Sequence, residues 1–494
     1  MRSILKSRIA AASLLVAFLV VAGCAVGPNF QRPAAPAAKS YTVLPINSAP
    51  GTTNVAGGEA QRFVAGLEIP GQWWALFHSE PLNKLIERSL TNNPDLKAAQ
   101  AALLVARENV LAQRGAYYPH VDASFSASRQ RQSGFIAPAP NANVFEYNLF
   151  TPQVSVSYVP DVFGLNRRTV EASKAQEQGA RFQMVATYLT LSANVVVAAI
   201  QEASLRAQIE TTRQLIGASS NMVEIVRYQY SKGYAGGLDV AAQEAQLAQV
   251  TATLPPLLKQ LAQQRDLLAV LAGDFPSDQN DEVFDLSKLK LPEELPVSLP
   301  SKLVEQRPDI LQAEQNLHAA SAQIGIATAN RFPNITLTAN AGSMALSLDK
   351  LFTSGSGFWG IGGTLSQPIF EGGTLLHQER GAKAAYLQAA QQYRSTVLTA
   401  CQNVADTLNA LEQDAAALKT AAAAATAAKV TLDLSSQQWQ VGYGGYLPLL
   451  IAEQSYEQAE LNLVQARANR FADTAALFQA LGGGWWNQAE LKEK

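Results

Sequence analysis

The fold of this chain is indicated by a stretch that occurs twice, as residues 93–127, NPDLKAAQAALLVARENVLAQRGAYYPHVDASFSA, and as residues 307–341, RPDILQAEQNLHAASAQIGIATANRFPNITLTANA. Each copy opens on a proline and an acidic residue, runs through Ala, Leu and Gln, and reaches a second proline before apolar and polar residues alternate. The copies lie about 210 residues apart, a period far longer than that of a solenoid repeat. The duplication predicts two halves with one plan.

In each half a helical segment leads into a β-hairpin. The opening helices are predicted at residues 82–117 and 301–331, and Pro119 and Pro333 end them. Alternation with period two is typical of strands that have one apolar and one polar face. The four strands are predicted at residues 121–127, 152–158, 335–341 and 358–366. Each chain thus contributes two amphipathic hairpins.

Two very long helices follow the hairpins, at about residues 168–231 and 374–439. Between Met184 and Tyr230 mostly apolar residues step by four and three, which predicts a coiled-coil seam. A turn with Gly233, Gly236 and Gly237 then reverses the chain. The apolar positions of the return helix recur at intervals of seven: Val240, Leu247, Leu254, Leu261 and Leu268.

Two further predictions concern the return helix: how it packs, and where its two prolines interrupt it. Stacked end to end on the opening helix of the next half, it would span about as much as one long helix. Pro255 and Pro256 lack the donor for an intrahelical bond, so we expect them to break or kink the helix near its middle.

Four amphipathic strands cannot close a barrel in a membrane. Such a barrel needs at least about eight strands and leaves no edge in lipid. We therefore expect the barrel to be shared between several chains and to continue into a helical tube, which makes a duct.

The N-terminus has the pattern of a secreted lipoprotein. Three basic residues precede an apolar run at residues 9–21, which closes on Val21-Ala22-Gly23-Cys24, a match to the bacterial lipobox. The prediction is an acylated Cys24, and the alternative is a coincidental cysteine after an ordinary signal. Ala25, in place of Asp, favours the outer membrane. We expect no later stretch of 18 or more strongly apolar residues, and therefore no transmembrane helix after the signal.

Composition argues against several function classes. The chain is 48% hydrophobic with a formal net charge of -2, which gives no support for a nucleic-acid partner. The histidines lack paired metal-ligand spacing, and there is no nucleophile elbow or phosphate loop, so we predict no enzyme, cofactor or metal.

Cys401 is interpreted as a small packing residue. The four tryptophans at 73, 74, 485 and 486 are interpreted as packing residues, and Tyr147 and Trp359 as membrane-interface candidates.

Several ordered blocks together resemble the TolC-like outer-membrane factors, in particular the OprM/NodT lipoprotein branch of bacterial efflux systems. Asn29 and Phe30 stand where Asp and Tyr are more usual, but the resemblance covers nearly the whole mature chain. The blocks are Cys24-Ala25-Val26-Gly27-Pro28-Asn29-Phe30, Trp73-Trp74, Asn93-Pro94-Asp95-Leu96, Arg307-Pro308-Asp309-Ile310 and Pro368-Ile369-Phe370-Glu371-Gly372-Gly373.

The resemblance implies a mainly α fold with a small β part. It implies a homotrimer with an α-helical barrel and a shared twelve-stranded β-barrel, four strands per protomer. With the internal repeat, the divisions are a signal peptide at 1–23, an N-terminal anchor and equatorial segment at 24–81, a first repeat at 82–299, a second repeat at 300–482 and a C-terminal equatorial tail at 483–494.

The resemblance also implies the functional positions. The periplasmic tips, which would meet a membrane-fusion adaptor, are Gly233, Tyr234, Leu238 and Asp239 in the first repeat and Gly442, Tyr443, Leu447 and Leu449 in the second. The gate candidates are Asp239, Leu447 and Ile451. Many relatives have Asp where this chain has Ile451, so an acidic ring would depend on Asp239 or others. The alternative for Asp239 is a helix cap.

The implied function is the exit duct of a tripartite efflux pump that exports small molecules, such as drugs or toxic compounds, from the periplasm or cytoplasm to the outside. The duct would lie in the outer membrane, anchored by lipid, and an inner-membrane pump, with the RND type favoured, would feed it. The alternatives are a duct for type I protein secretion and a lipoprotein scaffold without a pore. The lipobox and residues 27–30 favour efflux over secretion, and a scaffold would not need two amphipathic hairpins.

Overall fold

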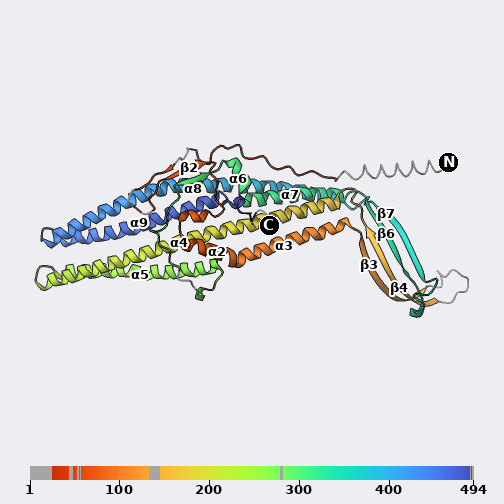
Figure 1. The fold of residues 1–494 in the computed structure, drawn as a ribbon, viewed down its shortest axis with the longest axis horizontal. Helices are drawn as coiled ribbons and strands as arrows, with labels where there is room; N and C mark the ends of the chain where they lie inside the picture. The colour runs from red at the N-terminus through yellow and green to blue at the C-terminus, as the bar shows by residue number, and fades with distance from the viewer. Residues whose placement is uncertain are drawn as a thin grey trace. The chain divides into compact units, whose positions relative to one another are not determined.

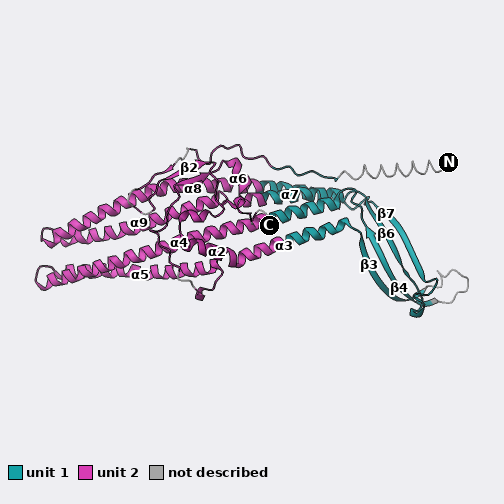
Figure 2. Ribbon diagram, in the orientation of Figure 1, with its two compact units in different colours: residues 1–32, 104–179, 313–392 teal, residues 33–103, 180–312, 393–494 magenta. Residues whose placement is uncertain are grey.

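The computed structural model describes residues 25–43, 48–52, 55, 57–132, 145–278, 282–489 and 491. The chain divides into two compact units, shown in different colours in Figure 2. Unit 1 contains residues 1–32, 104–179 and 313–392, and unit 2 contains residues 33–103, 180–312 and 393–494. Each unit therefore takes segments from both repeats.

The element order follows the predicted duplication (Figure 1). The helices are α2 (Glu80–Asn92), α3 (Pro94–Arg114), α4 (Leu165–Ser231), α5 (Gly237–Ala272), α6 (Pro300–Gln306), α7 (Pro308–Ala329), α8 (Thr374–Gln440) and α9 (Tyr446–Ala480). The strands are β1 (Ser48–Ala49), β2 (Gln61–Ala65), β3 (His120–Gln132), β4 (Phe145–Tyr158), β5 (Glu294–Val297), β6 (Asn334–Ser343) and β7 (Gly357–Ser366). The mainly helical fold with two strand hairpins and two long helical hairpins is confirmed.

Both opening helices are interrupted, which the prediction of one helix at 82–117 and one at 301–331 missed. The first breaks at Asn93, with ψ of 126°, and the second at Arg307, with ψ of 124°. Each of these residues precedes a proline, whose ring excludes the helical conformation from the residue before it. The Asn93 side chain then caps α3, because its Oδ1 accepts hydrogen bonds from the N–H groups of Asp95 and Leu96.

The return helices stack within their own half, and the prediction of stacking on the next half is wrong. In the first repeat the Asn93 side-chain amide donates to the carbonyl of Leu271 at the end of α5, at 3.1 Å. In the second repeat Arg307 Nη1 donates to the carbonyl of Ala480 at the end of α9, at 3.0 Å. An antiparallel hairpin brings the chain back along its own long helix, so its end arrives at the opening helix of the same repeat.

Helix α5 continues through Pro255 and Pro256, so the predicted break does not occur. The two carbonyls that lose their intrahelical donors belong to Thr251 and Ala252, which are exposed, and water can solvate them. The predicted seam of α5 is also only partly right. Of its seven-spaced residues only Leu268 is buried, whereas the polar Gln243 and Gln246 are buried instead.

The seam predicted along α4 is confirmed, because most of its residues from Met184 to Val226 are buried. The expectation that no strongly apolar stretch of about 18 residues follows the signal is wrong. Among the described residues, α4 holds an 18-residue window of mean hydropathy 1.5, long and apolar enough to cross a membrane. Since 61% of that window is buried in the chain, its composition is that of a helix inside a protein core.

Unit 2 also contains a small sheet, in the order β1-β2-β5, that the sequence analysis did not predict. Strands β2 and β5 pair in parallel although they lie more than 200 residues apart. In the same unit the tryptophans pack as interpreted: Trp73 stacks on Phe478 with ring centroids 5.3 Å apart, and Trp485 Nε1 donates to the Gln306 carbonyl at 2.7 Å.

Candidate functional site: an amphipathic sheet and two helical tips

Unit 1 carries an antiparallel sheet in the strand order β3-β4-β6-β7, and its register sorts the side chains by polarity. Apolar residues line up in rows across all four strands: Ala123, Val154, Ala341 and Trp359 in one row, and Val121, Val156, Ala339 and Ile361 in the next. The row between them is Asp122, Ser155, Asn340 and Gly360. Because successive residues point to opposite faces, one face of the sheet is apolar and the other polar.

The apolar face is not covered by other described residues of the chain. Trp359 is 76% exposed and Ile361 is 80% exposed. The strands are 10 to 14 residues long, and a transmembrane strand needs about 9 to 11. Along β3 the apolar residues extend from Val121 to Ala127, roughly 20 Å, close to the band of about 25 Å in membrane barrels. The sheet therefore has the dimensions and polarity of a membrane-spanning wall.

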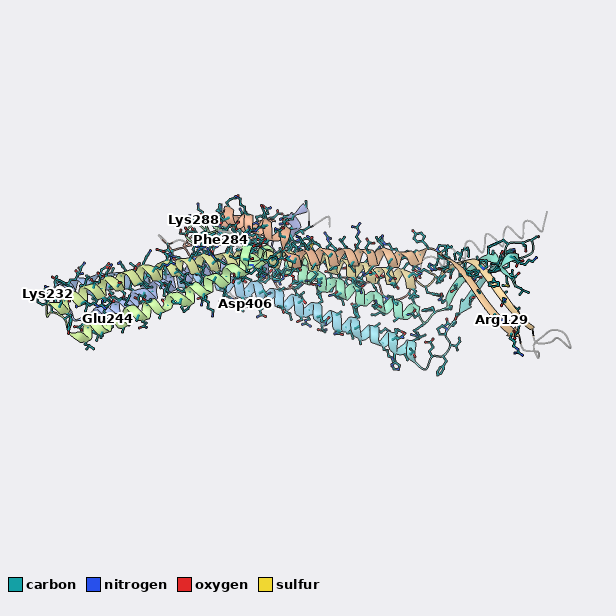
Figure 3. All side chains as sticks on the ribbon, turned by 90° about the horizontal axis from the view of Figure 1, so that it is seen from below. Arg129, Lys232, Glu244, Phe284, Lys288 and Asp406 are labelled. Carbon is teal, nitrogen blue, oxygen red and sulfur yellow. The ribbon has the colours of Figure 1, made fainter. Side chains whose placement is uncertain are left out.

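Charged residues end the apolar band. On β3 Arg129 follows Ala127 on the same face, and it pairs with Glu146 of β4 at 3.2 Å (Figure 3). Trp359 lies on the apolar face, as a membrane-interface residue requires. Tyr147 lies on the polar face, where its hydroxyl donates to Gln130 Oε1 at 3.0 Å, so its interpretation as a membrane-interface residue is wrong.

The sheet has two unpaired edges. Within the part of the chain that the structure describes, β3 pairs only with β4, and β7 only with β6. Each edge presents a row of backbone N–H and C=O groups that water can satisfy but lipid cannot. An apolar face with two such edges is incomplete as a single chain in a membrane.

The segment that follows the predicted lipidation site is held tightly in unit 1, although Cys24 itself lies outside the described residues. Arg168 of α4, whose side chain is 4% exposed, donates to the carbonyls of Val26 at 3.1 Å and Gly27 at 3.2 Å, and to Asn29 Oδ1 at 2.9 Å. Gly27 has φ of 90°, and a Cβ there would lie 2.5 Å from the Gly325 Cα. Only glycine allows this close approach to α7.

A second layer of contacts completes this clamp. Phe30 stacks on His318 of α7 with ring centroids 4.3 Å apart, and His318 Nε2 lies 3.0 Å from Glu171 Oε1 of α4. Arg168 pairs with Glu171 at 2.7 Å. Burial acts to raise the pKa of Glu171, but the hydrogen bonds from Arg168 and His318 together hold it below its ordinary value. The clamp thus joins α4 of the first repeat to α7 of the second.

The first tip reverses the chain between α4 and α5 and carries Lys232 (Figure 3). Gly233 has φ of 78° with open space where a Cβ would stand, so its glycine serves the turn conformation. Asp239 accepts a hydrogen bond from the Gly236 N–H at 2.8 Å in the first turn of α5. This is a helix cap, and gating by Asp239 stays a prediction. The side chains of Tyr234 and Leu238 are exposed.

The second tip repeats this geometry between α8 and α9. Gly442 has φ of 79°, and Tyr443, Leu447 and Ile451 are exposed. Leu449 is fully buried, at 0% exposure, in a cluster with Val226 and Trp439. The prediction that Leu449 contacts an adaptor is therefore wrong, because the helical period turns its side chain into the core while Leu447 faces outward.

The remaining candidates from the sequence are Cys401 and possible metal ligands. Cys401 is half-buried, and burial raises the pKa of its thiol, which suits a packing residue. Among the described residues no three His, Cys, Asp or Glu side chains gather as metal ligands. Sequence reasoning missed Arg168 and four polar residues between the tip hairpins, namely the buried Gln243, Gln246 and Glu453 and the half-buried Glu457. The available signal was two glutamines three residues apart, which places them on one face of the predicted return helix.

An amphipathic sheet whose strands are long enough to span a membrane, followed in the chain by long helical hairpins, is typical of outer-membrane channels with a helical extension. The family model for the outer membrane efflux protein matches residues 85–274 and 299–483. The chain belongs to the outer membrane efflux protein family. This is a family of efflux ducts, and its members lie in the outer membrane.

Individual relatives agree over nearly the full length. The chain is 30% identical over 482 residues to the probable efflux pump outer membrane protein TtgC of Pseudomonas putida, covering 96% of each chain. The solved outer-membrane channel OprN is similar with a TM-score of 0.85 and 25% identity, over 94% of this chain and 100% of that one. The outer membrane protein VceC of Vibrio cholerae gives a TM-score of 0.78 and 28% identity, over 84% and 99%. The fold is that of these TolC-like channels.

Proposed function

We propose that this chain is one protomer of a homotrimeric exit duct in a tripartite pump that expels small molecules. The observation that carries the proposal is the sheet with one apolar face and two unpaired edges. If β7 of one copy pairs with β3 of the next, every edge is satisfied and the apolar face meets lipid all round. Three copies supply twelve strands, within the range of outer-membrane barrels.

The helices next to these edges support the same assembly. α3 leads into β3 and exposes Leu104, Val105 and Leu111, while β7 leads into α8, which exposes Leu376 and Leu387. Two different surfaces of one chain that meet head to tail generate a ring when the rotation closes. The apolar residues on both lateral surfaces supply the contact that such an interface buries.

The tips and the N-terminus fit the other partners. The exposed tip residues Tyr234, Leu238, Tyr443 and Leu447 would contact a periplasmic membrane-fusion adaptor, and an inner-membrane pump, of the RND type in our proposal, would supply the energy. Acyl chains on Cys24 would anchor the protein, with the Arg168 clamp holding the segment beside the anchor. The relative TtgC is described as part of an efflux pump, which supports a duct for small molecules over a protein-secretion duct.

The duct is tested by single-channel conductance of the purified, detergent-extracted protein in planar bilayers. We expect small, flickering currents in the wild type and larger ones in Asp239→Ala, because that change removes the hydrogen bond from the Gly236 N–H and costs about 1 kcal/mol at the tip. Gly233→Pro should act in the same direction, because proline cannot adopt its positive φ. Protein that extracts as a monomer and carries no current would contradict the duct.

Adaptor contact is tested by a pair of leucines two residues apart. Leu447→Ser should weaken binding of the cognate adaptor roughly tenfold while leaving thermal stability nearly unchanged, because the side chain is exposed. Leu449→Ser should lower stability by about 2 to 4 kcal/mol, since its side chain is fully buried. Calorimetric binding and thermal unfolding separate the two effects, and equal adaptor affinity of wild type and Leu447→Ser would argue against contact there.

A further inference from the structure

The first tip hairpin consists of α4 and α5, and the second of α8 and α9 (Figure 1). Within unit 2, two buried glutamines of α5 join the first hairpin to the second. Gln243 Nε2 donates to Glu453 Oε2 of α9 at 3.2 Å, and Gln243 Oε1 accepts from the hydroxyl of Tyr446. One turn along, Gln246 Nε2 donates to Glu457 Oε2 at 3.2 Å, and Gln246 Oε1 accepts from Gln454 Nε2 at 2.7 Å. We call these two sets of contacts the glutamine bridges.

Both bridges have the same pattern of hydrogen bonds. Each glutamine amide is neutral, and it offers its N–H to a glutamate and its oxygen to a donor, both from α9. Glu453 is buried and Glu457 is half-buried. Within the described residues neither carboxylate forms an ion pair with lysine or arginine. Two acidic side chains one helical turn apart are thus held between hairpins with no cation to compensate them.

The other groups around the bridges do not supply that cation. On the α4 side Ser219 Oγ accepts from Gln243 Nε2 at 3.4 Å, and Arg227 is occupied by Glu244, at 2.6 Å. Asp239 of α5 adds a further negative charge, which with Glu453 helps to raise the pKa of Tyr446 after the larger effect of burial. On the far side of α9, Lys429 pairs with Asp433 and lies over the ring of Tyr456, whose neighbour is Glu460.

Burial therefore dominates the protonation of both glutamates. It raises the pKa of Glu453, against the hydrogen bond from Gln243. It raises the pKa of Glu457 to about 7, with a further increase from the charge of Glu453 and an opposing effect of the Gln246 hydrogen bond. When the hairpins separate, water solvates both carboxyl groups and their pKa values return toward the ordinary value of 4.5.

We propose that the glutamine bridges form a proton-dependent latch, which joins the two tip hairpins when Glu453 and Glu457 are protonated and releases them when both are ionised. The joined state binds protons more tightly than the separated state. The free energy that favours joining is therefore fully present below the ordinary carboxyl pKa and is lost as the pH rises through the raised values, up to about 7 for Glu457. The latch rests on the proposed duct, because separated tips would widen its exit path.

The direct test measures the separation of the hairpins rather than transport. Spin labels at Tyr234→Cys and Tyr443→Cys, both exposed, report the distance between tips in a Cys401→Ser background, in trimers assembled with excess unlabelled chains. We expect a longer distance at about pH 8 than at about pH 5. The double variant E453Q/E457Q should keep the short distance at both, because glutamine copies the protonated shape and cannot ionise. The matched control E460Q, on the same helix but outside the bridges, should respond like the wild type.

Conductance of the full-length trimer gives the second measurement. The open fraction of the wild type and of E460Q should rise about tenfold between about pH 5 and about pH 8, and that of E453Q/E457Q should stay low. A wild-type tip distance that is the same at both pH values, or a double variant that still responds, overturns the latch. Wild-type protein whose tips separate with pH but which carries no current supports the latch and contradicts the duct.

Discussion

Replacing Ala339 with arginine will keep the protein out of the outer membrane. Ala339 lies in the middle of β6, in the apolar row with Val156 and Ile361. In the proposed barrel this row faces lipid, where an arginine near the bilayer midplane costs about 2 to 4 kcal/mol. Because a trimer carries the substitution three times, we expect at least a tenfold loss of detergent-extractable trimer from purified outer membranes, measured by quantitative blotting.

The neighbouring residue supplies the control. Thr338 lies on the polar face, opposite Ser157 and Gly362, where the adjacent glycine leaves room for a longer side chain. Thr338→Arg adds the same charge one residue away but points it into the water-filled interior of the proposed barrel. Its trimer yield should stay within about twofold of the wild type. Equal losses in both variants would mean that the two faces are not lipid and water.

Replacing Arg168 with alanine will release the segment beside the predicted lipid anchor and destabilise unit 1. The buried guanidinium is the shared donor for Val26, Gly27 and Asn29, and it is paired with Glu171. Removing it takes the shared donor from two carbonyl groups and leaves Glu171 with only His318 of these two partners. Truncating one member of a buried charged network costs about 3 to 5 kcal/mol. Thermal unfolding should therefore shift to a lower temperature, and protease should cut within residues 25–43.

An exposed arginine of the same unit controls for the loss of charge alone. Arg107→Ala on α3 should leave both measurements unchanged, because its side chain lies on the surface. Arg168→Lys should recover only part of the stability, since one ammonium group cannot reach the acceptors that the planar guanidinium serves together. A segment that stays protected in Arg168→Ala would show that Phe30 and Arg32, rather than Arg168, hold it.

Periodicity predicted the elements well where local chemistry decides them. The seam of α4 and the alternation of β3 and β6 could be found because burial on one face imposes a period of 3.6 or 2 on the residues themselves. The two interruptions, at Asn93 and Arg307, were also readable, since each residue precedes a proline. The failed break at Pro255 and Pro256 shows the limit of such rules: exposed carbonyl groups can be satisfied by water.

The tips show which part of a site needs the tertiary structure. Leu447 and Leu449 are alike in the sequence, and only packing against Val226 and Trp439 turns Leu449 into a core residue. Asp239 was left open between a gate and a cap, and its hydrogen bond to Gly236 identifies the cap. The glutamine bridges join residues about 210 positions apart, which no local pattern can pair.

The sequence by itself determined the duplicated plan, the helical and strand hairpins and the polarity of the sheet, because each follows from the period and order of neighbouring residues. Only the tertiary structure decided which return helix meets which opening helix, how Arg168 holds the N-terminal segment, and which polar residues join the two tips. These contacts depend on where the chain returns after one or two hundred residues. The position to which the chain comes back depends on how the whole helical hairpin packs, and no single residue within the hairpin determines it.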